Sequence, residues 1–229
     1  MESFKLFSFE HFGIIFFNIL LFTFLILIAN FFNKRKFAKI SAIIIFLIKI
    51  SELSYRYLYN NEKITELLPL HLCNITLIFI IIMMFSGSKT LFQLCYYWSL
   101  GAIFAIATPD VKYSFPNFMT LSFFITHFYI LFAVIYACIF FKFRPALWGY
   151  FSAFITINLI CIGVYFLNDQ LGTNYLYVNR VPDFSSPLNY FGEWPYYIIV
   201  VELIYIILTY IIYFPMKNRA VKFGKKKFY

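Results

Sequence analysis

The stretch FMTLSFFITHFYILFAVIYACIFF, residues 118–141, contains no charged side chain. A transmembrane helix needs about 20 consecutive apolar residues, so this stretch predicts one membrane-spanning helix. The whole chain of 229 residues has the same character, because 62% of its residues are hydrophobic and only 13% are charged. Soluble domains are nearer half apolar and a quarter charged. The sequence therefore predicts an all-α fold, a polytopic membrane helical bundle.

Seven stretches are long and apolar enough to cross a membrane. They are residues 12–32, 39–59, 67–86, 91–109, 118–141, 147–167 and 195–215. The second is the least hydrophobic because it contains Lys49, Glu52 and Arg56. We expect about seven transmembrane helices that form a single domain over residues 1–229.

The basic residues predict the orientation of this bundle. If the N-terminus lies outside, the cytoplasmic segments are 33–39, 87–90, 142–146 and 216–229, which hold 13 basic residues and no acid. Positive charge concentrates on the cytoplasmic side of membrane proteins, so we expect N-out and C-in. The net charge of +9 then reflects topology, and nucleic acid is not an expected partner. The basic tail, 216–229, is expected to face anionic lipids of the inner leaflet.

The longest connection, residues 168–194, lies outside in this orientation. It contains prolines, glycines and many aromatic side chains, whereas a plain linker would be more polar. We therefore expect a lid-like extracytoplasmic loop that can lie against the membrane interface.

Ionisable side chains within the predicted spans gather in the outer half of the bilayer, counted at about 1.5 Å per helical residue. They are Lys49, Glu52, Arg56, His71, His127 and Glu202, and Asp110 closes the fourth span. Such residues usually face a bundle interior or a wet cavity, so we expect a polar cavity open to the outer leaflet. Lys49, Glu52 and Arg56 share one helix face by their spacing. That face either neutralises itself or binds a lipid headgroup, with Arg56 placed for a phosphate.

The stretch LPLHLCNI, residues 68–75, places three reactive or polar side chains at the start of the third span. With Pro69 in the first helical turn, His71 and Asn74 share a face, and Cys73 points about 200° away from His71. A base for Cys73 should therefore come from another helix, and His127 is the other histidine within a span. A neighbouring imidazole can generate the thiolate nucleophile, and His71 and Asn74 could orient substrate. A structural role for Cys73 stays open, and the spacings predict no metal site and no cofactor.

Several motifs resemble the YwaF-like family of bacterial integral membrane proteins. They are LPLHLCNI (68–75), YYWSLGAIFAIATPD (96–110), FFITH (123–127), GTNYLYVNRVP (172–182) and FGEWPYY (191–197). That family is related to a eukaryotic transmembrane acyltransferase that remodels ether phospholipids, and more distantly to androgen-induced hydrolases of fatty-acid esters. The resemblance implies a Cys73 nucleophile with His127 as its partner, and places Asp110, Asn174 and Tyr175 around the site. The hydrolases use a Thr–His pair, so the cysteine at position 73 favours a resemblance to the acyltransferase over one to the hydrolases.

Three functions follow as hypotheses. The first is an acyltransferase or lipid ester hydrolase that acts on phospholipid acyl chains in the outer leaflet of the bacterial plasma membrane. The second is a protein that binds or transports a small solute or lipid, using Glu52, Arg56 and Glu202 in the same cavity. The third is a structural subunit in which buried polar groups only hold helices together.

Overall fold

The computed structural model describes residues 3–184 and 186–224, with side chains described through Met216. Its helices, in chain order, are α1 (Phe9–Ala29), α2 (Lys34–Leu58), α3 (Ile64–Leu67), α4 (Leu72–Ser86), α5 (Lys89–Ala107), α6 (Phe118–Phe140), α7 (Leu147–Leu171), η1 (Tyr175–Tyr177), η2 (Pro187–Tyr190) and α8 (Tyr196–Gly224). Each of the seven predicted stretches contains most of one helix, although the helix in stretch 67–86 is short and begins only at Leu72. The all-helical prediction is thus confirmed for the part of the chain that the structure describes.

Five helices are long and apolar enough to span a membrane: α1, α5, α6, α7 and the part of α8 over Tyr196–Met216. Helix α2 carries Lys49, Glu52 and Arg56, and α4 has only 15 residues. At about 1.5 Å per residue, α4 is roughly 22 Å long, which is less than the hydrocarbon thickness of a bilayer. The multi-pass membrane architecture is supported, while seven complete crossings stay a prediction.

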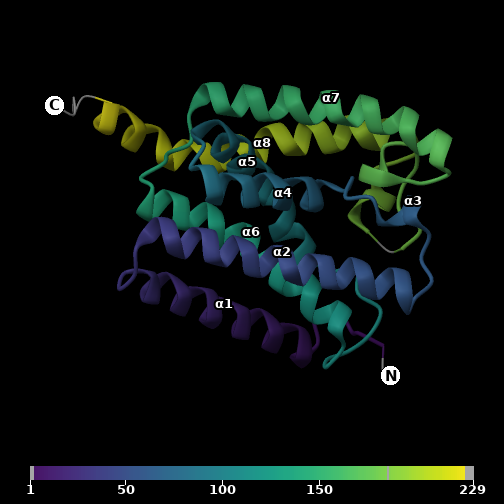
Figure 1. The fold of residues 1–229 in the computed structure, drawn as a ribbon. Helices are drawn as coiled ribbons and strands as arrows, with labels where there is room; N and C mark the ends of the chain where they lie inside the picture. The colour runs from purple at the N-terminus through teal and green to yellow at the C-terminus, as the bar shows by residue number, and fades with distance from the viewer. Residues whose placement is uncertain (1–2, 185, 225–229) are drawn as a thin grey trace.

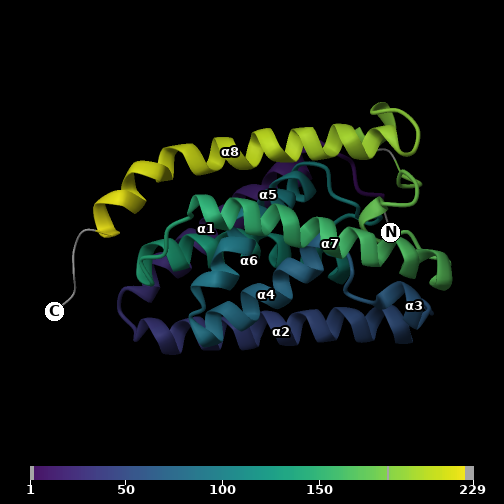
Figure 2. The ribbon, with the colours of Figure 1, turned by 90° about the horizontal axis from the view of Figure 1, so that it is seen from above.

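The helices form three groups, which Figure 1 and Figure 2 show from two directions. Helices α4, α5 and α6 lie in the middle and pack on one another, α1 and α2 lie on one side, and α7 and α8 lie on the other. Most of the largest buried side chains come from the central group, among them Trp98, Tyr97 and Tyr136. Large apolar side chains of α1, α7 and α8 are exposed, as expected for surfaces that face lipid.

Small residues bring helices α2 and α6 close together. Ala38 and Ala42 on α2, and Ala133 and Ala137 on α6, are all fully buried. Small side chains allow the close backbone approach on which helix packing in membranes depends. The Tyr136 hydroxyl on α6 donates to the Lys34 carbonyl on α2 at 2.7 Å, which fixes the register of the two helices at one end.

The connections with basic residues meet at that same end of the bundle. The Arg35 guanidinium lies 4.5 Å from the ring centre of Phe141, and a side chain added at Gly87 would collide with Arg35. The Gln93 amide donates to the Arg144 carbonyl at 2.9 Å. The predicted cytoplasmic segments around residues 33–39, 87–90 and 142–146 therefore share one end. The charge asymmetry predicts that this end is cytoplasmic.

Most of the last predicted cytoplasmic segment, 216–229, has no described side chains. The backbone of α8 continues to Gly224, residues 225–229 lie outside the described residues, and side chains are described only up to Met216. Contact of the basic tail with anionic lipids stays a prediction.

Replacing Gly149 by alanine tests the packing of α7 on α5. A Cβ at Gly149 would collide with the Gln93 side chain, which also accepts from the Ala146 amide at 2.9 Å and donates to the Arg144 carbonyl. We expect Gly149→Ala to cost about 1–3 kcal/mol, as overpacking does, and to lower the unfolding temperature measured by tryptophan fluorescence. Gly163→Ala on the same helix is the matched control, because nothing lies within 4 Å of its added Cβ. Equal stability of the two variants would contradict the packing.

Single cysteines placed in two loops test the orientation. Lys63 and Lys89 lie at opposite ends of the bundle, and both are exposed. In intact cells we expect a membrane-impermeant maleimide to label Lys63→Cys and to leave Lys89→Cys unlabelled until the membrane is opened. The reverse pattern would mean that the N-terminus is cytoplasmic.

Candidate active site

Helix α4 begins inside the bundle rather than at its outer end. The chain leaves α2 at Leu58, forms the short α3, and runs extended through Leu68 before α4 starts at Leu72. The expectation that Pro69 lies in the first helical turn is wrong. His71 is the N-cap and has an extended backbone, so the 200° angle from Cys73, which assumes a helix, does not apply to it.

Lys49, Cys73 and His127 lie at a similar depth in the bundle, counted from its basic end. Arg35, Gly87 and Phe141 meet at the basic end. From that junction, Lys49 follows Arg35 by 14 residues, Cys73 precedes Gly87 by 14, and His127 precedes Phe141 by 14. At 1.5 Å per helical residue, each lies about 21 Å from the junction.

Electrostatic interactions agree with this shared depth. The charge of Lys49 acts on both Cys73 and His127, and that of Glu52 acts on His127. Cys73 also packs against the central apolar core, which includes residues of α6. Helices α2, α4 and α6 therefore place Cys73 and His127 each within electrostatic reach of Lys49, and a direct Cys73–His127 pair stays a prediction. Among the described residues no hydrogen bond joins Cys73 to His127.

Cys73 is the second residue of α4, where backbone N–H groups lack an intrahelical partner. The His71 carbonyl accepts from the Asn74 and Ile75 amides at 2.9 and 3.1 Å, which leaves the Leu72 and Cys73 amides for other acceptors. Free N–H groups and the positive end of the helix dipole stabilise negative charge. Such an environment suits an oxyanion.

The ring of His127 is oriented by its own helix. Its Nδ1 lies 2.7 Å from the Phe123 carbonyl oxygen, and because a carbonyl only accepts, Nδ1 must carry the proton. The neutral ring then keeps a lone pair on Nε2, the arrangement that a general base needs. The Phe123 ring packs on the imidazole with centres 4.1 Å apart.

A chain of ion pairs runs outward from the same neighbourhood along α2. The Lys49 ammonium contacts Glu52 at 2.7 Å, the Arg56 guanidinium lies 3.9 Å from Glu52, and Arg56 also contacts Glu62 at 2.5 Å. The prediction that Lys49, Glu52 and Arg56 share a face is confirmed. Two bases and two acids cancel, so the face neutralises itself.

Glu52 also links two helices. Its Oε2 accepts from the Ser122 hydroxyl of α6 at 2.7 Å, and the Glu52 side chain is buried. The sequence reasoning did not select Ser122. An uncharged hydroxyl in an apolar helix gives little signal, although Ser122 stands five residues before His127 in the same motif region.

The loop after α7 covers the segment that leads into α4. The Leu176 amide donates to His71 Nδ1 at 3.4 Å, and the Tyr175 hydroxyl donates to the Thr65 carbonyl at 2.7 Å. The rings of Tyr175 and Tyr177 lie 5.0 and 5.2 Å from the His71 ring. Tyr175 therefore lies near the site, as the resemblance implies. Movement of the loop stays a prediction.

Two asparagines hold this loop together. The buried Asn168 side chain bonds to the Tyr175 backbone and to the side chains of Thr173 and Asn179. Asn174 bonds to the backbone of Arg180 and Val181. Asn174 is thus a loop-fixing residue near the site. Asn168 was missed because its partners depend on how the following loop folds back.

The remaining predicted site residues are not all brought together. Asp110 is exposed and interacts electrostatically with Lys112, Arg56 and Tyr177 at the outer end. Asn74 lies in the first turn of α4 and is half-buried. Glu202 lies elsewhere, between α7 and α8, where it accepts from Asn158 at 3.3 Å. Within the described residues, no three His, Cys, Asp or Glu side chains lie close enough to hold a metal ion.

The Arg56–Glu62 pair predicts a pH dependence of stability. Burial raises the pKa of Glu62, but hydrogen bonds from Arg56 at 2.8 and 2.5 Å and from Asn60 outweigh it, so its pKa lies below the usual 4.5. A carboxyl whose pKa falls on folding stabilises the protein above its unfolded pKa, and this contribution disappears as pH falls through the folded value. We expect the unfolding temperature of the wild type to drop more steeply below about pH 4.5 than that of Glu62→Gln. Parallel curves for the two proteins would contradict this assignment.

Comparisons with known proteins place the chain in a family. Residues 6–213 match the TMEM164 family. An uncharacterized protein of Treponema pallidum (strain Nichols) is 27% identical over 115 residues, which is 50% of this chain and 48% of the relative. The chain therefore spans about half the length of that relative, and no solved structure matches. Because the family match covers most of the chain, the protein belongs to the TMEM164 family.

Proposed function

We propose that the protein is a membrane-embedded, thiol-dependent acyltransferase or lipid ester hydrolase that acts on phospholipid acyl chains. The observation that carries the proposal is the position of Cys73 at the interior N-terminus of α4, at the depth of His127, whose Nδ1 bonds to the Phe123 carbonyl so that Nε2 keeps the lone pair. The resemblance to YwaF-like proteins, a finer assignment than the TMEM164 family, implies the same pair. The expected location is the outer leaflet of a bacterial plasma membrane.

The proposed reaction has two steps. In the first, His127 Nε2 takes the Cys73 proton while the sulfur attacks the carbonyl carbon of a lipid ester. The ester C–O bond then breaks, the departing alkoxide receives that proton from His127, and the acyl group remains on sulfur as a thioester. In the second, an acceptor alcohol or water gives its proton to His127 and attacks the thioester, which releases the acyl product and returns the proton to the thiol.

The described groups divide this work between them. The Leu72 and Cys73 amides at the start of α4, which have no acceptor among the residues that the structure describes, would hold the negative oxygen that forms on the carbonyl in each step. Lys49, whose charge acts on both Cys73 and His127, would favour the thiolate. His71 and Tyr175 line the approach from the loop side. Asn174 holds the outer loop in place through its bonds to Arg180 and Val181, and Asn74 and Asp110 take no step in this reaction.

The competing hypothesis is a binding or transport protein that uses the charged face of α2. Arg56 and Glu52 would then contact solute or a lipid phosphate. In the structure these side chains are engaged with Lys49 and Glu62, which favours a structural role for that face. The competing hypothesis predicts ligand-dependent stabilisation that survives Cys73→Ser and no covalent chemistry.

Intact-protein mass spectrometry tests the enzyme. We expect a hydroxylamine-sensitive acyl adduct on wild-type protein supplied with phospholipid, and none on Cys73→Ala. His127→Ala should form it about 10²- to 10⁴-fold more slowly, the usual contribution of a general base. Cys138→Ala is the matched control, because Cys138 is also a partly buried cysteine of an apolar helix, and it should keep the adduct. An adduct that persists in Cys73→Ala, or no adduct after trapping with added phospholipid, would count against acyl-enzyme chemistry.

A further inference from the structure

Two tyrosines of the loop after α7 pack on the same imidazole, and they differ in what their hydroxyls bind. The rings of Tyr175 and Tyr177 lie 5.0 and 5.2 Å from the His71 ring. The Tyr175 hydroxyl donates to the Thr65 carbonyl at 2.7 Å, which ties it to the segment before α4. No residue that the structure describes forms a hydrogen bond with the Tyr177 hydroxyl. A phenol can donate and accept, so Tyr177 keeps both capacities for a ligand.

The Tyr177 phenol lies within electrostatic reach of Cys73. Cys73 and Asp110 both act on Tyr177, whereas the charged groups that act on Tyr175 lie in α2, α3 and the connection between them. Burial, together with the acidic groups of Asp110, Cys73 and Asp183, raises the pKa of Tyr177 to about 12. The phenol therefore keeps its proton at neutral pH and is a hydrogen-bond donor. Of the two tyrosines, Tyr177 is the one that can meet a substrate bound to Cys73.

The backbone that presents Tyr177 is held in an unfavourable conformation. Leu176 and Tyr177 have φ angles of 57° and 53°, in the left-handed region that residues with bulky side chains rarely adopt. The Leu176 amide donates to His71 Nδ1 at 3.4 Å, and the Tyr177 carbonyl accepts from the Tyr197 hydroxyl of α8. Residues kept in such conformations cluster at active sites and ligand clamps. The outlier therefore points to a function for the side chain at position 177.

We propose that Tyr177 is a further catalytic residue, whose hydroxyl donates a hydrogen bond to the ester carbonyl oxygen as the Cys73 sulfur attacks. The inference rests on the proposed function, because it adds one donor to that reaction. The amides of Leu72 and Cys73 would approach this oxygen from α4, and Tyr177 would approach it from the loop. Donors aimed at the position of the developing oxyanion lower the barrier to acyl transfer. The phenol keeps its own proton throughout and is free again once the carbonyl re-forms.

The competing interpretation is that Tyr177 only packs on its neighbours and holds the loop. Its ring lies 5.2 Å from the His71 ring and 5.9 Å from the Phe184 ring. Tyr177→Phe separates the two roles, because it removes the hydroxyl and keeps the ring that makes these contacts.

A long-chain trifluoromethyl ketone tests the donor on the full chain in amphipol. The Cys73 sulfur adds to the ketone carbon, the thiol proton passes to His127, and the hemithioketal oxygen takes the place of the oxyanion. Fluorine NMR distinguishes this adduct from the free ketone. We expect Tyr177→Phe to weaken ketone binding about 10- to 100-fold, the usual strength of one hydrogen bond to a charged group. With phospholipid, the maximal rate of acyl-adduct formation should fall about 10²- to 10³-fold, at an unchanged half-saturating lipid concentration.

Alkylation of Cys73 by iodoacetamide is the control reaction, because it consumes the same sulfur and forms no oxyanion. Its rate, followed by peptide mass spectrometry, should be equal in the wild type and in Tyr177→Phe.

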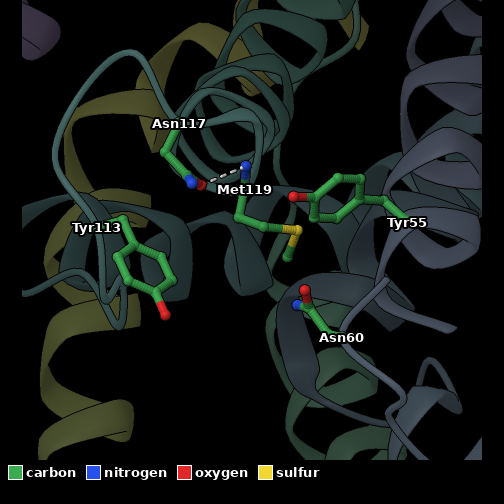
Figure 3. Close-up of a pocket in the computed structure, with 5 residues that line it drawn as sticks. All are labelled: Tyr55, Asn60, Tyr113, Asn117 and Met119. Carbon is green, nitrogen blue, oxygen red and sulfur yellow. Dashed lines mark hydrogen bonds between the residues drawn. The ribbon is translucent and has the colours of Figure 1, made fainter. Parts of the chain in front are cut away.

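Tyr55→Phe is the matched control variant. Tyr55 is also half-buried and lines an open pocket of about 300 Å³ together with Asn60, Tyr113, Asn117 and Met119. Figure 3 shows its hydroxyl pointing toward Met119. It stands six residues beyond Lys49 on α2, which is about 9 Å along the helix from the depth of Cys73. We expect Tyr55→Phe to bind the ketone and form the acyl adduct as the wild type does.

Two results would overturn the assignment of Tyr177. One is equal ketone binding and equal acylation in Tyr177→Phe and the wild type. The other is an iodoacetamide rate that falls as much as the acylation rate, which would mean that Tyr177 only holds the site. Both contradict the inference alone, provided that the wild type forms its acyl adduct.

The ketone also separates this inference from the proposed function. A hemithioketal that weakens in Tyr177→Phe, with no acyl adduct from phospholipid in the wild type, would contradict only the proposed substrate. A wild type that forms neither adduct would contradict both proposals.

Discussion

Backbone amides and carbonyls within a membrane protein must be paired inside the protein, because lipid offers no partners. The segment 68–71, which is not helical, meets this constraint through its neighbours: the Leu70 amide donates to the Leu68 carbonyl, and the His71 carbonyl accepts from the first turn of α4. The loop after α7 completes the arrangement, since Leu176 donates to His71 and Tyr175 donates to Thr65. Without this mutual support α4 could not begin deep in the bundle, and its free amides would lie at the surface instead of beside Cys73.

The charged side chains in the interior are likewise paired within the protein. Glu52 is buried and has Lys49, Arg56 and Ser122 within reach. Removing one partner of a buried ion pair is far more destabilising than replacing both, so the acidic and basic residues of α2 form one unit. This unit keeps a positive charge near Cys73 and His127 while the face of α2 stays neutral as a whole.

Much of the fold follows from the sequence, since long charge-free stretches such as 118–141 allow few alternatives to a helix. The depth at which α4 begins does not follow from the sequence. Pro69 is compatible both with a first helical turn and with the extended segment that the structure contains. The pairing of Cys73 with His127 excluded His71 by a helical angle that does not apply to its extended backbone, so the pairing stays a prediction. Ser122 could not be selected because its role depends on α2 lying beside α6. Asn168 could not be selected because its role depends on how the loop after α7 folds back. The rise per helical residue also placed Glu202 in the same outer half as Glu52, but only the packing of α7 on α8 shows that it belongs to a separate contact with Asn158.

The shared depth of Lys49, Cys73 and His127 constrains how the chain can change in length. Each is held at about 21 Å from the junction of Arg35, Gly87 and Phe141 by an unbroken helical stretch of 14 residues. One inserted residue in any of these stretches would shift its side chain by about 1.5 Å and rotate it by about 100°, out of the common neighbourhood. Insertions in the loops at the outer end would leave that geometry intact. Homologues with the same site should therefore vary in loop length while these three stretches keep their residue count.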